Sequence, residues 1–200
     1  MIYWVSYFLI KLLSWIYFPC TFIGRENIPA KGAFLITSNH ISNLDPFLIG
    51  SGFSRKLNYL AKEELFRTKF TNFFFRKVGA FPIKRGGADL GAIKEVFKRL
   101  KSEEPVLLFP EGTRTLDPAK RKIQAGVGLI AAKSGLPVIP VYINGSDKVL
   151  PAGAKWLKRN RVTVTFGKAF QFTKGKPNIS IAQEIMDNIF RLAETKAAPR

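Results

Sequence analysis

Apolar and polar positions along the chain follow the two periods that are typical of strands and helices. Short apolar or β-branched runs, which are typical of buried strands, lie at residues 33–38, 57–60, 80–83, 106–109, 137–143 and 161–166. Helical periodicity covers residues 89–101, 123–134 and 180–194. Strands that alternate with helices in this way predict an α/β domain in which helices flank a mixed, mostly parallel sheet.

Local signals refine the boundaries and faces of the predicted helices. Asp45 is a candidate N-cap for a helix that starts at Pro46, because proline is well tolerated in the first turn. Ser180 and Gln183 have the spacing of a capping box at the start of the last helix. The helix at 89–101 has one apolar face, which we expect to be buried: Leu90, Ile93, Val96, Phe97 and Leu100.

The N-terminal segment is strongly apolar, with Lys11 its only charge between Ile2 and Cys20. Wound as a helix, it places most of its polar side chains within one arc of about 140°: Tyr3, Ser6, Tyr7, Lys11, Ser14 and Tyr17. This segregation favours a helix that lies in a membrane interface. A spanning helix with Lys11 in its middle and an ordinary core helix are the alternatives. We therefore divide the chain into a membrane-associating helix at 1–20 and an α/β domain at 21–200.

Composition and charge exclude several classes of protein and favour an anionic partner. The chain has 200 residues, 46% of them hydrophobic, which argues against disorder, and its mean hydropathy of +0.03 is too low for a polytopic membrane protein. One cysteine and one histidine exclude a disulfide framework, a cysteine-based zinc site and a multi-histidine metal centre. The net charge of +18 favours an anionic partner: nucleic acid, anionic lipid or a phosphorylated substrate.

A second aromatic stretch, Leu65–Phe75, has basic residues among and beside its phenylalanines. Aromatic rings among cations are typical of a surface that stacks nucleic-acid bases. The same pattern also fits an edge that contacts lipid, with cations at the level of the headgroups. A core helix with a solvated basic face is the third interpretation.

Candidate chemistry begins at the carboxyl end of the strand predicted at 33–38. His40 follows this strand, and Asp45 lies five residues further on. These positions are about 140° apart on a regular helix, so a contact between them requires a turn, which Ser42 and Asn43 could form. A carboxylate bonded to one imidazole nitrogen would fix the tautomer and stabilise the charge that forms when the other nitrogen takes a proton. In the alternative interpretation, Asp45 only caps the next helix.

Two other strand ends carry groups suited to a phosphate. Gly112 permits a tight turn whose amides could bind an anion, and Arg114 supplies a bidentate donor. Glu111 fits beside a phosphate only if it orients an arginine or accepts from a substrate hydroxyl. Lys84 and Arg85 follow the strand at 80–83.

Four strings of the sequence resemble the motif blocks of the glycerolipid acyltransferases, the 1-acyl-glycerol-3-phosphate acyltransferase family. Asn39–Asp45 is similar to that family's His-x4-Asp block, and Phe109–Arg114 to its Phe-Pro-Glu-Gly-Thr-Arg block. Gly79–Arg85 resembles its intermediate arginine-containing block, although Lys84 stands where an acidic residue is common. Leu136–Val141 resembles its final Val-Pro-Ile-Pro-like block. The resemblance implies that this family's α/β fold extends over residues 21–200.

The resemblance also implies roles for these residues. His40 would be the general base for the acceptor hydroxyl, and Asp45 would orient it. The acceptor's glycerol phosphate would be held by Lys84, Arg85, Glu111, Gly112, Thr113 and Arg114. The strand Pro137–Val141 would lie on the acyl donor's side of the site or pack beneath it. No metal or cofactor is implied beyond the acyl-CoA or acyl carrier protein that serves as co-substrate.

The function implied is acyl transfer to the sn-2 hydroxyl of 1-acyl-sn-glycerol-3-phosphate, giving phosphatidic acid in phospholipid biosynthesis. We expect a peripheral or monotopic enzyme on the cytoplasmic face of the cell membrane, with an anionic membrane surface as partner and no nucleic acid. One alternative keeps the chemistry and changes the acceptor to glycerol-3-phosphate, another lysophospholipid or a lyso-ornithine lipid. The other is a non-catalytic basic protein that binds membrane or nucleic acid.

Overall fold

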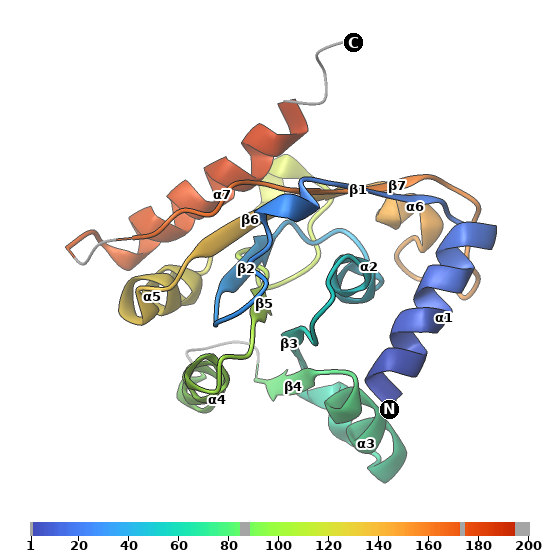
Figure 1. The fold of residues 1–200 in the computed structure, drawn as a ribbon, viewed down its shortest axis with the longest axis horizontal. Coiled ribbons are helices and arrows are strands. Elements are labelled where there is room, and N and C mark those ends of the chain that lie inside the picture. The colour runs from blue at the N-terminus through green and yellow to red at the C-terminus, as the bar shows by residue number, and fades with distance from the viewer. Residues whose placement is uncertain (1, 85–88, 173–174, 195–200) are drawn as a thin grey trace.

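The computed structural model of the chain describes residues 2–84, 89–172 and 175–194 (Figure 1). Its helices and strands, in chain order, are α1 (Ile2–Ile16), β1 (Cys20–Ile23), η1 (Arg25–Asn27), β2 (Leu35–Ser38), α2 (Asp45–Ser51), β3 (Asn58–Lys62), η2 (Glu63–Phe66), α3 (Lys69–Lys77), β4 (Ala80–Ile83), α4 (Leu90–Lys101), β5 (Val106–Leu108), η3 (Pro118–Lys120), α5 (Ala125–Ser134), β6 (Val138–Asn144), α6 (Ser146–Val149), β7 (Val162–Phe166) and α7 (Asn178–Glu194).

The strands form one seven-stranded sheet in the order β1-β7-β6-β2-β5-β3-β4. All neighbouring strands are parallel except β6 and β7, which are antiparallel. The predicted mixed, mostly parallel α/β sheet is therefore confirmed. In the middle of the sheet, Thr37 of β2 pairs with Leu108 of β5 on one side and with Pro140 of β6 on the other. Because these three strands are parallel, the segments that follow them meet at one edge of the sheet.

Helices cover both faces of the sheet, with α4, α5 and α7 on one face and α1, α2 and α3 on the other (Figure 1). Each face buries its own apolar core, and the short apolar strands contribute to both. Helices α5 and α7 pack closely because position 128 is a glycine. A Cβ atom on Gly128 would collide with the backbone carbonyl of Asn178.

Two details of the predicted helices are wrong. Helix α7 begins at Asn178, so Ser180 lies inside it, and the Gln183 side chain donates to Asp187 at 2.8 Å. The capping box therefore does not form. Leu90 is exposed at the start of α4, because the buried face of that helix is made by Ala92, Val96 and Leu100. The predicted boundary between residues 20 and 21 falls inside β1, and it stays a prediction.

Helix α1 turns most of its polar side chains toward the domain and most of its apolar ones outward, although Ile2 and Ile10 pack against the core and Lys11 is exposed. The Tyr3 hydroxyl accepts from the backbone N–H of Leu57 at 3.0 Å, and Tyr3 and Tyr7 line a small crevice against α2. Trp15 on the outward side is 81% exposed. No residue of α1 is buried, so its interpretation as a core helix is wrong. Among the described residues, no helix combines the length and apolarity needed to cross a membrane.

The stretch Leu65–Phe75 divides its apolar side chains between the core and the surface. Phe66, Phe74 and Phe75 pack against the core, whereas Phe70 and Phe73 of α3 are exposed. The core interpretation thus accounts for part of this stretch only. Exposed rings beside Lys69 and Lys77 fit both the lipid-contacting edge and the base-stacking surface, and both interpretations stay predictions.

Candidate active site

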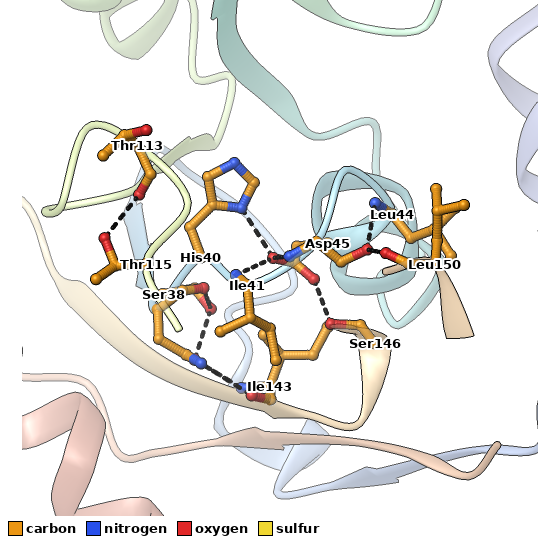
Figure 2. A network of polar contacts seen from close by, with 12 residues as sticks. Ser38, His40, Ile41, Leu44, Asp45, Thr113, Thr115, Ile143, Ser146 and Leu150 are labelled. Atoms are coloured by element: carbon orange, nitrogen blue, oxygen red, sulfur yellow. Dashed lines mark hydrogen bonds and ion pairs between the residues drawn. The ribbon is translucent and has the colours of Figure 1, made fainter. Parts of the chain in front are cut away.

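His40 and Asp45 form a direct contact at the carboxyl end of β2 (Figure 2). The His40 Nδ1 atom lies 2.8 Å from Asp45 Oδ2. The side chain of His40 is 12% exposed, whereas that of Asp45 is fully buried. Figure 2 shows the other ring nitrogen, Nε2, pointing away from the carboxylate. With Nδ1 protonated and donating to Asp45, Nε2 is the basic nitrogen available to a substrate.

Asp45 is held by three donors besides the histidine. The backbone N–H groups of Ile41 and Ser42 both donate to Oδ2 at 2.8 Å, and the Ser146 hydroxyl donates to Oδ1 at 2.6 Å. The carboxylate thus turns back onto the loop that precedes α2 and makes no side-chain cap bond to that helix, whose N-cap is Leu44. The interpretation of Asp45 as a helix cap is wrong, and the required turn between the two residues is present.

Two side chains attach the loop of His40 to neighbouring segments. One binds β6, and the other binds the residue that follows α6. Asn39 is paired with Ile143 twice: its Nδ2 donates to the Ile143 carbonyl at 2.9 Å, and its Oδ1 accepts from the Ile143 N–H at 2.8 Å. The Ser42 hydroxyl donates to the Leu150 carbonyl at 3.1 Å. Sequence reasoning missed these contacts and that of Ser146, although the Asn144-Gly145 break after a strand was a signal for a turn near the site.

The loop that follows β5 closes around His40. The ring of Phe109 stacks on the imidazole at 4.0 Å between centroids, with an interplanar angle of 19°. The Thr115 N–H donates to the His40 carbonyl at 2.9 Å. Gly112 makes the tight turn between these contacts with a φ of 64°, which favours glycine. The two longest motifs of the sequence therefore form one site.

Only some of the predicted phosphate-binding residues lie on the loop that contacts His40. Gly112, Thr113 and Arg114 are exposed on the loop that contacts His40. Lys84 is exposed at the end of β4, at the edge of the sheet, and β3 and β5 separate that strand from β2. Arg85 lies outside the described residues. The structure therefore brings the loop with Arg114 to His40 and leaves Lys84 at a distance along the sheet edge.

Glu111 is buried beneath the same loop. Glu111 is only 1% exposed, and its carboxylate lies 3.7 Å from the Nε atom of Arg121. The Cζ atom of Arg121 lies 3.9 Å from the ring centroid of Phe190, so the guanidinium stacks on that ring. Burial raises the pKa of Glu111 from its ordinary value of 4.5 to about 7, although the charge of Arg121 opposes the shift. The glutamate is thus placed to orient an arginine, as one of the two predicted roles requires, but that arginine is Arg121, which sequence reasoning missed. A role of Glu111 in binding the acceptor stays a prediction.

The raised pKa of Glu111 predicts a specific effect of pH on stability. Between about pH 4.5 and 7, native Glu111 holds a proton that the unfolded chain has lost, so its contribution to the free energy of unfolding is present at low pH and disappears as the pH rises. Glu111→Gln stays neutral throughout. Relative to the parent protein, this variant should therefore gain up to about 3 kcal/mol between about pH 5 and pH 8, measured by urea unfolding at each pH. A difference that does not change with pH would contradict the raised pKa.

The strand similar to the last motif block lies inside the sheet. Val138, Ile139, Pro140 and Val141 of β6 are buried, and β6 pairs with β2 directly below the His40 loop. This position supports a packing role for the strand. A role on the acyl donor's side of the site stays a prediction.

A buried carboxylate that orients an accessible imidazole at the carboxyl ends of parallel strands is the arrangement of an enzyme that uses a general base. A family model described as Acyltransferase matches residues 19–144. The chain belongs to this acyltransferase family, and the family resemblance seen in the sequence motifs is confirmed.

Several known acyltransferases are similar to the chain. The 1-acyl-sn-glycerol-3-phosphate acyltransferase of Bacillus subtilis is 29% identical over 181 residues, which cover 86% of this chain and 87% of that protein. The enzyme of that name from Pseudomonas aeruginosa is 34% identical over 139 residues, 68% of this chain and 52% of that one. The crystal structure of the 1-acyl-sn-glycerophosphate acyltransferase from Thermotoga maritima matches with a TM-score of 0.78 and 26% identity, covering 100% of this chain and 81% of the other. The chain thus spans most of the Bacillus relative and about half of the Pseudomonas one.

Proposed function

We propose that this protein transfers a fatty acyl group from an acyl thioester to the sn-2 hydroxyl of 1-acyl-sn-glycerol-3-phosphate, giving phosphatidic acid. The observation that carries the proposal is the His40–Asp45 contact of 2.8 Å, with the loop of Arg114 hydrogen-bonded to the backbone of His40. This arrangement offers a base and a cation on one loop system, as an acceptor with both a hydroxyl and a phosphate requires. The names of the relatives support the same acceptor.

The site's geometry supports a direct transfer with His40 as both base and acid. His40 Nε2 takes the proton from the acceptor hydroxyl as its oxygen attacks the thioester carbonyl. Asp45, which accepts from Nδ1, stabilises the imidazolium that results. When the carbon–sulfur bond breaks, the imidazolium returns the proton to the leaving thiolate. The ester and the free thiol are the products, and His40 is neutral again.

The acceptor's phosphate has a candidate partner in Arg114. This arginine is exposed near the turn at Gly112, so its guanidinium is accessible to a bidentate contact with phosphate oxygens. Lys84 and Arg85 are further candidates for the same anion or for a neighbouring headgroup. Glu111 and Arg121, which are linked below the loop, would hold it in position.

Arg114→Ala should raise the KM for the acceptor by about 10–100-fold, because one charge-assisted contact with the phosphate is lost. The KM for the acyl donor should change by much less. The measurement is steady-state kinetics with each substrate varied in turn, with Lys120→Ala as a control, since that exposed cation lies in the same segment and pairs with Asp117. Equal effects on both KM values would refute a phosphate role for Arg114.

The outward face of α1 supports a membrane location for the enzyme. The side chains exposed on this helix are mainly apolar: Trp4, Val5, Phe8, Leu9, Leu12, Leu13, Trp15 and Ile16. A patch of this kind is costly in water and is typical of a helix that lies in a lipid interface. We infer that α1 lies in the cytoplasmic leaflet of the cell membrane as a peripheral or monotopic anchor. The lipid substrate of the enzyme is dissolved in the same leaflet.

Product analysis with the full chain in detergent micelles tests the proposed function. The protein is given 1-acyl-sn-glycerol-3-phosphate with either acyl-CoA or acyl carrier protein as donor, and we expect phosphatidic acid from at least one of them. Parallel reactions offer glycerol-3-phosphate, other lysophospholipids and a lyso-ornithine lipid. Transfer to one of these with none to 1-acyl-sn-glycerol-3-phosphate would overturn the acceptor. An absence of transfer to any acceptor would overturn the enzyme hypothesis in favour of a binding protein.

A further inference from the structure

The segment between α6 and β7, residues 150–161, carries an unusually exposed tryptophan. Trp156 is 83% exposed, more than any other large apolar side chain of the described residues. We call this segment the α6–β7 loop. This exposure leaves most of the ring's apolar area in contact with water, and tryptophan is typical of membrane–water interfaces, where the ring contacts both phases.

The α6–β7 loop is held in a defined shape, so the exposure of Trp156 is a consequence of the fold. The N–H of Lys158 donates to the Val149 carbonyl at 2.8 Å, and the Asn160 side chain donates to the Gly145 carbonyl at 3.1 Å. These bonds close the loop at its base, in the manner of a compact Ω-loop. Leu157, the neighbour of Trp156, packs against the core below. One side chain therefore anchors the loop while the next is presented outward.

The two ends of the loop lie beside the catalytic turn and beside the end of α1. At the first end, the Leu150 carbonyl accepts from Ser42 in the turn between His40 and Asp45. At the other end, the N–H of Val162 donates to the Pro19 carbonyl at 2.9 Å, three residues after the last residue of α1. Figure 1 shows α6 and the segment after it at the end of the sheet where α1 lies. The loop thus runs between the segment that follows α1 and the turn that carries His40 and Asp45.

The charge of the α6–β7 loop complements an anionic bilayer. Between positions 150 and 161 the sequence has four cations and no carboxylate: Lys155, Lys158, Arg159 and Arg161. All four are exposed. Cations that flank an exposed aromatic ring match phosphates at the headgroup level with the ring seated just below them.

We propose that the α6–β7 loop is a second membrane contact of this protein, in which Trp156 enters the interface of an anionic bilayer and the flanking cations bind lipid phosphates. With α1, it makes two points of attachment that turn the His40 site toward the membrane. The inference rests on the proposed function, which supplies a substrate dissolved in the bilayer. An acidic acyl carrier protein would match the charge as well, but the exposed Trp156 ring and the junction of the loop with the segment after α1 favour lipid.

The position of Trp156 on a bilayer can be measured directly. In a full-length chain with Trp4→Phe and Trp15→Phe, Trp156 is the only tryptophan. On vesicles of phosphatidylcholine and phosphatidylglycerol, its emission should shift to shorter wavelength and be quenched by lipids with brominated acyl chains. Sedimentation of the same samples identifies the bound protein. Bound protein whose Trp156 emission stays unshifted and unquenched would overturn the proposal.

A charge variant in the parent sequence gives a second test. Replacing Lys155, Lys158 and Arg159 with glutamine should weaken partitioning onto the mixed vesicles by about a hundredfold, since each cation contributes roughly fivefold near such a surface. The matched control replaces Lys94, Lys98 and Lys101 of α4, which lie exposed on the opposite face of the sheet. Equal losses in the two triple variants would show a general effect of net charge and refute the proposed contact.

Two further readouts separate this proposal from the proposed function. The loop triple variant should keep its rate in detergent micelles, because the catalytic residues are untouched. If the parent chain transfers no acyl group in micelles, the proposed function fails, while the quenching result still decides the position of Trp156. If the triple variant loses binding to acyl carrier protein and keeps its vesicle binding, the loop is a protein-docking site and the membrane contact is refuted.

Discussion

His40→Ala should lower kcat for acyl transfer by roughly 10²–10⁴-fold, which is the usual contribution of a positioned general base. The sequence contains no second histidine, so no other imidazole is available to take over its role. The ring is partly exposed, stacks on Phe109 and makes one hydrogen bond to Asp45. Its loss should therefore cost no more than about 2 kcal/mol of unfolding free energy.

The measurement pairs single-turnover rates in detergent micelles with urea unfolding of the same preparations. Phe109→Leu is the matched control, because it removes the ring that stacks on His40 and keeps the imidazole and its carboxylate. We expect this control to retain most of the rate. Activity of His40→Ala within a few-fold of the parent would show that another group is the base, and the mechanism proposed above would fail.

The sequence contained enough information for most of the fold and for the central pair of the site. Strand β4 was predicted with its observed bounds, because residues 80–83 are apolar and glycines mark both sides of the run. The end of α5 was also predictable, since Gly135 adopts the left-handed conformation that terminates a helix. Such signals are local: they depend on a few neighbouring residues and on the period of apolar positions.

The errors and omissions at the site arose where distant segments decide the outcome. Asp45 satisfies every local criterion for a helix cap, yet its carboxylate is held by Ser146, 101 residues away, and by the turn at Ile41 and Ser42. Arg121 gave no signal in the sequence, because its importance comes from a buried contact with Glu111. Contacts of this kind are properties of the packed sheet, in which strands far apart in sequence end side by side.

The polarity of α1 shows a related limit. Periodicity separated most of its polar positions from its apolar ones, although Ile10 packs against the core and Lys11 is exposed, and it could not determine which arc packs on the domain. The structure places the hydroxyl of Tyr3 against the backbone of Leu57 and leaves the apolar arc outside. That orientation attaches the helix to the domain and leaves its apolar side available for the lipid contact proposed above.

Variants of Asp45 separate its structural role from its chemical role. Asp45→Ala leaves the N–H groups of Ile41 and Ser42 and the hydroxyl of Ser146 without their acceptor, and each buried unsatisfied group costs about 1–3 kcal/mol. We expect this variant to lose at least about 3 kcal/mol of unfolding free energy and all measurable transfer activity. Such a loss alone would not distinguish an unfolded loop from a missing carboxylate.

Asp45→Asn makes that distinction, because its amide can satisfy the same donors. With its oxygen at the position of Oδ2, it accepts from Ile41, Ser42 and His40, and its NH₂ group meets the Ser146 hydroxyl, which can rotate to accept. The variant should stay within about 2 kcal/mol of the parent in urea unfolding. Its kcat should still fall by roughly 10²–10⁴-fold, because a neutral amide does not stabilise the imidazolium. Ser146→Ala removes one donor and keeps the carboxylate, so its kcat should fall by about tenfold or less. A stable Asp45→Asn variant with nearly full activity would mean that the carboxylate serves the fold alone and that His40 needs no negative partner.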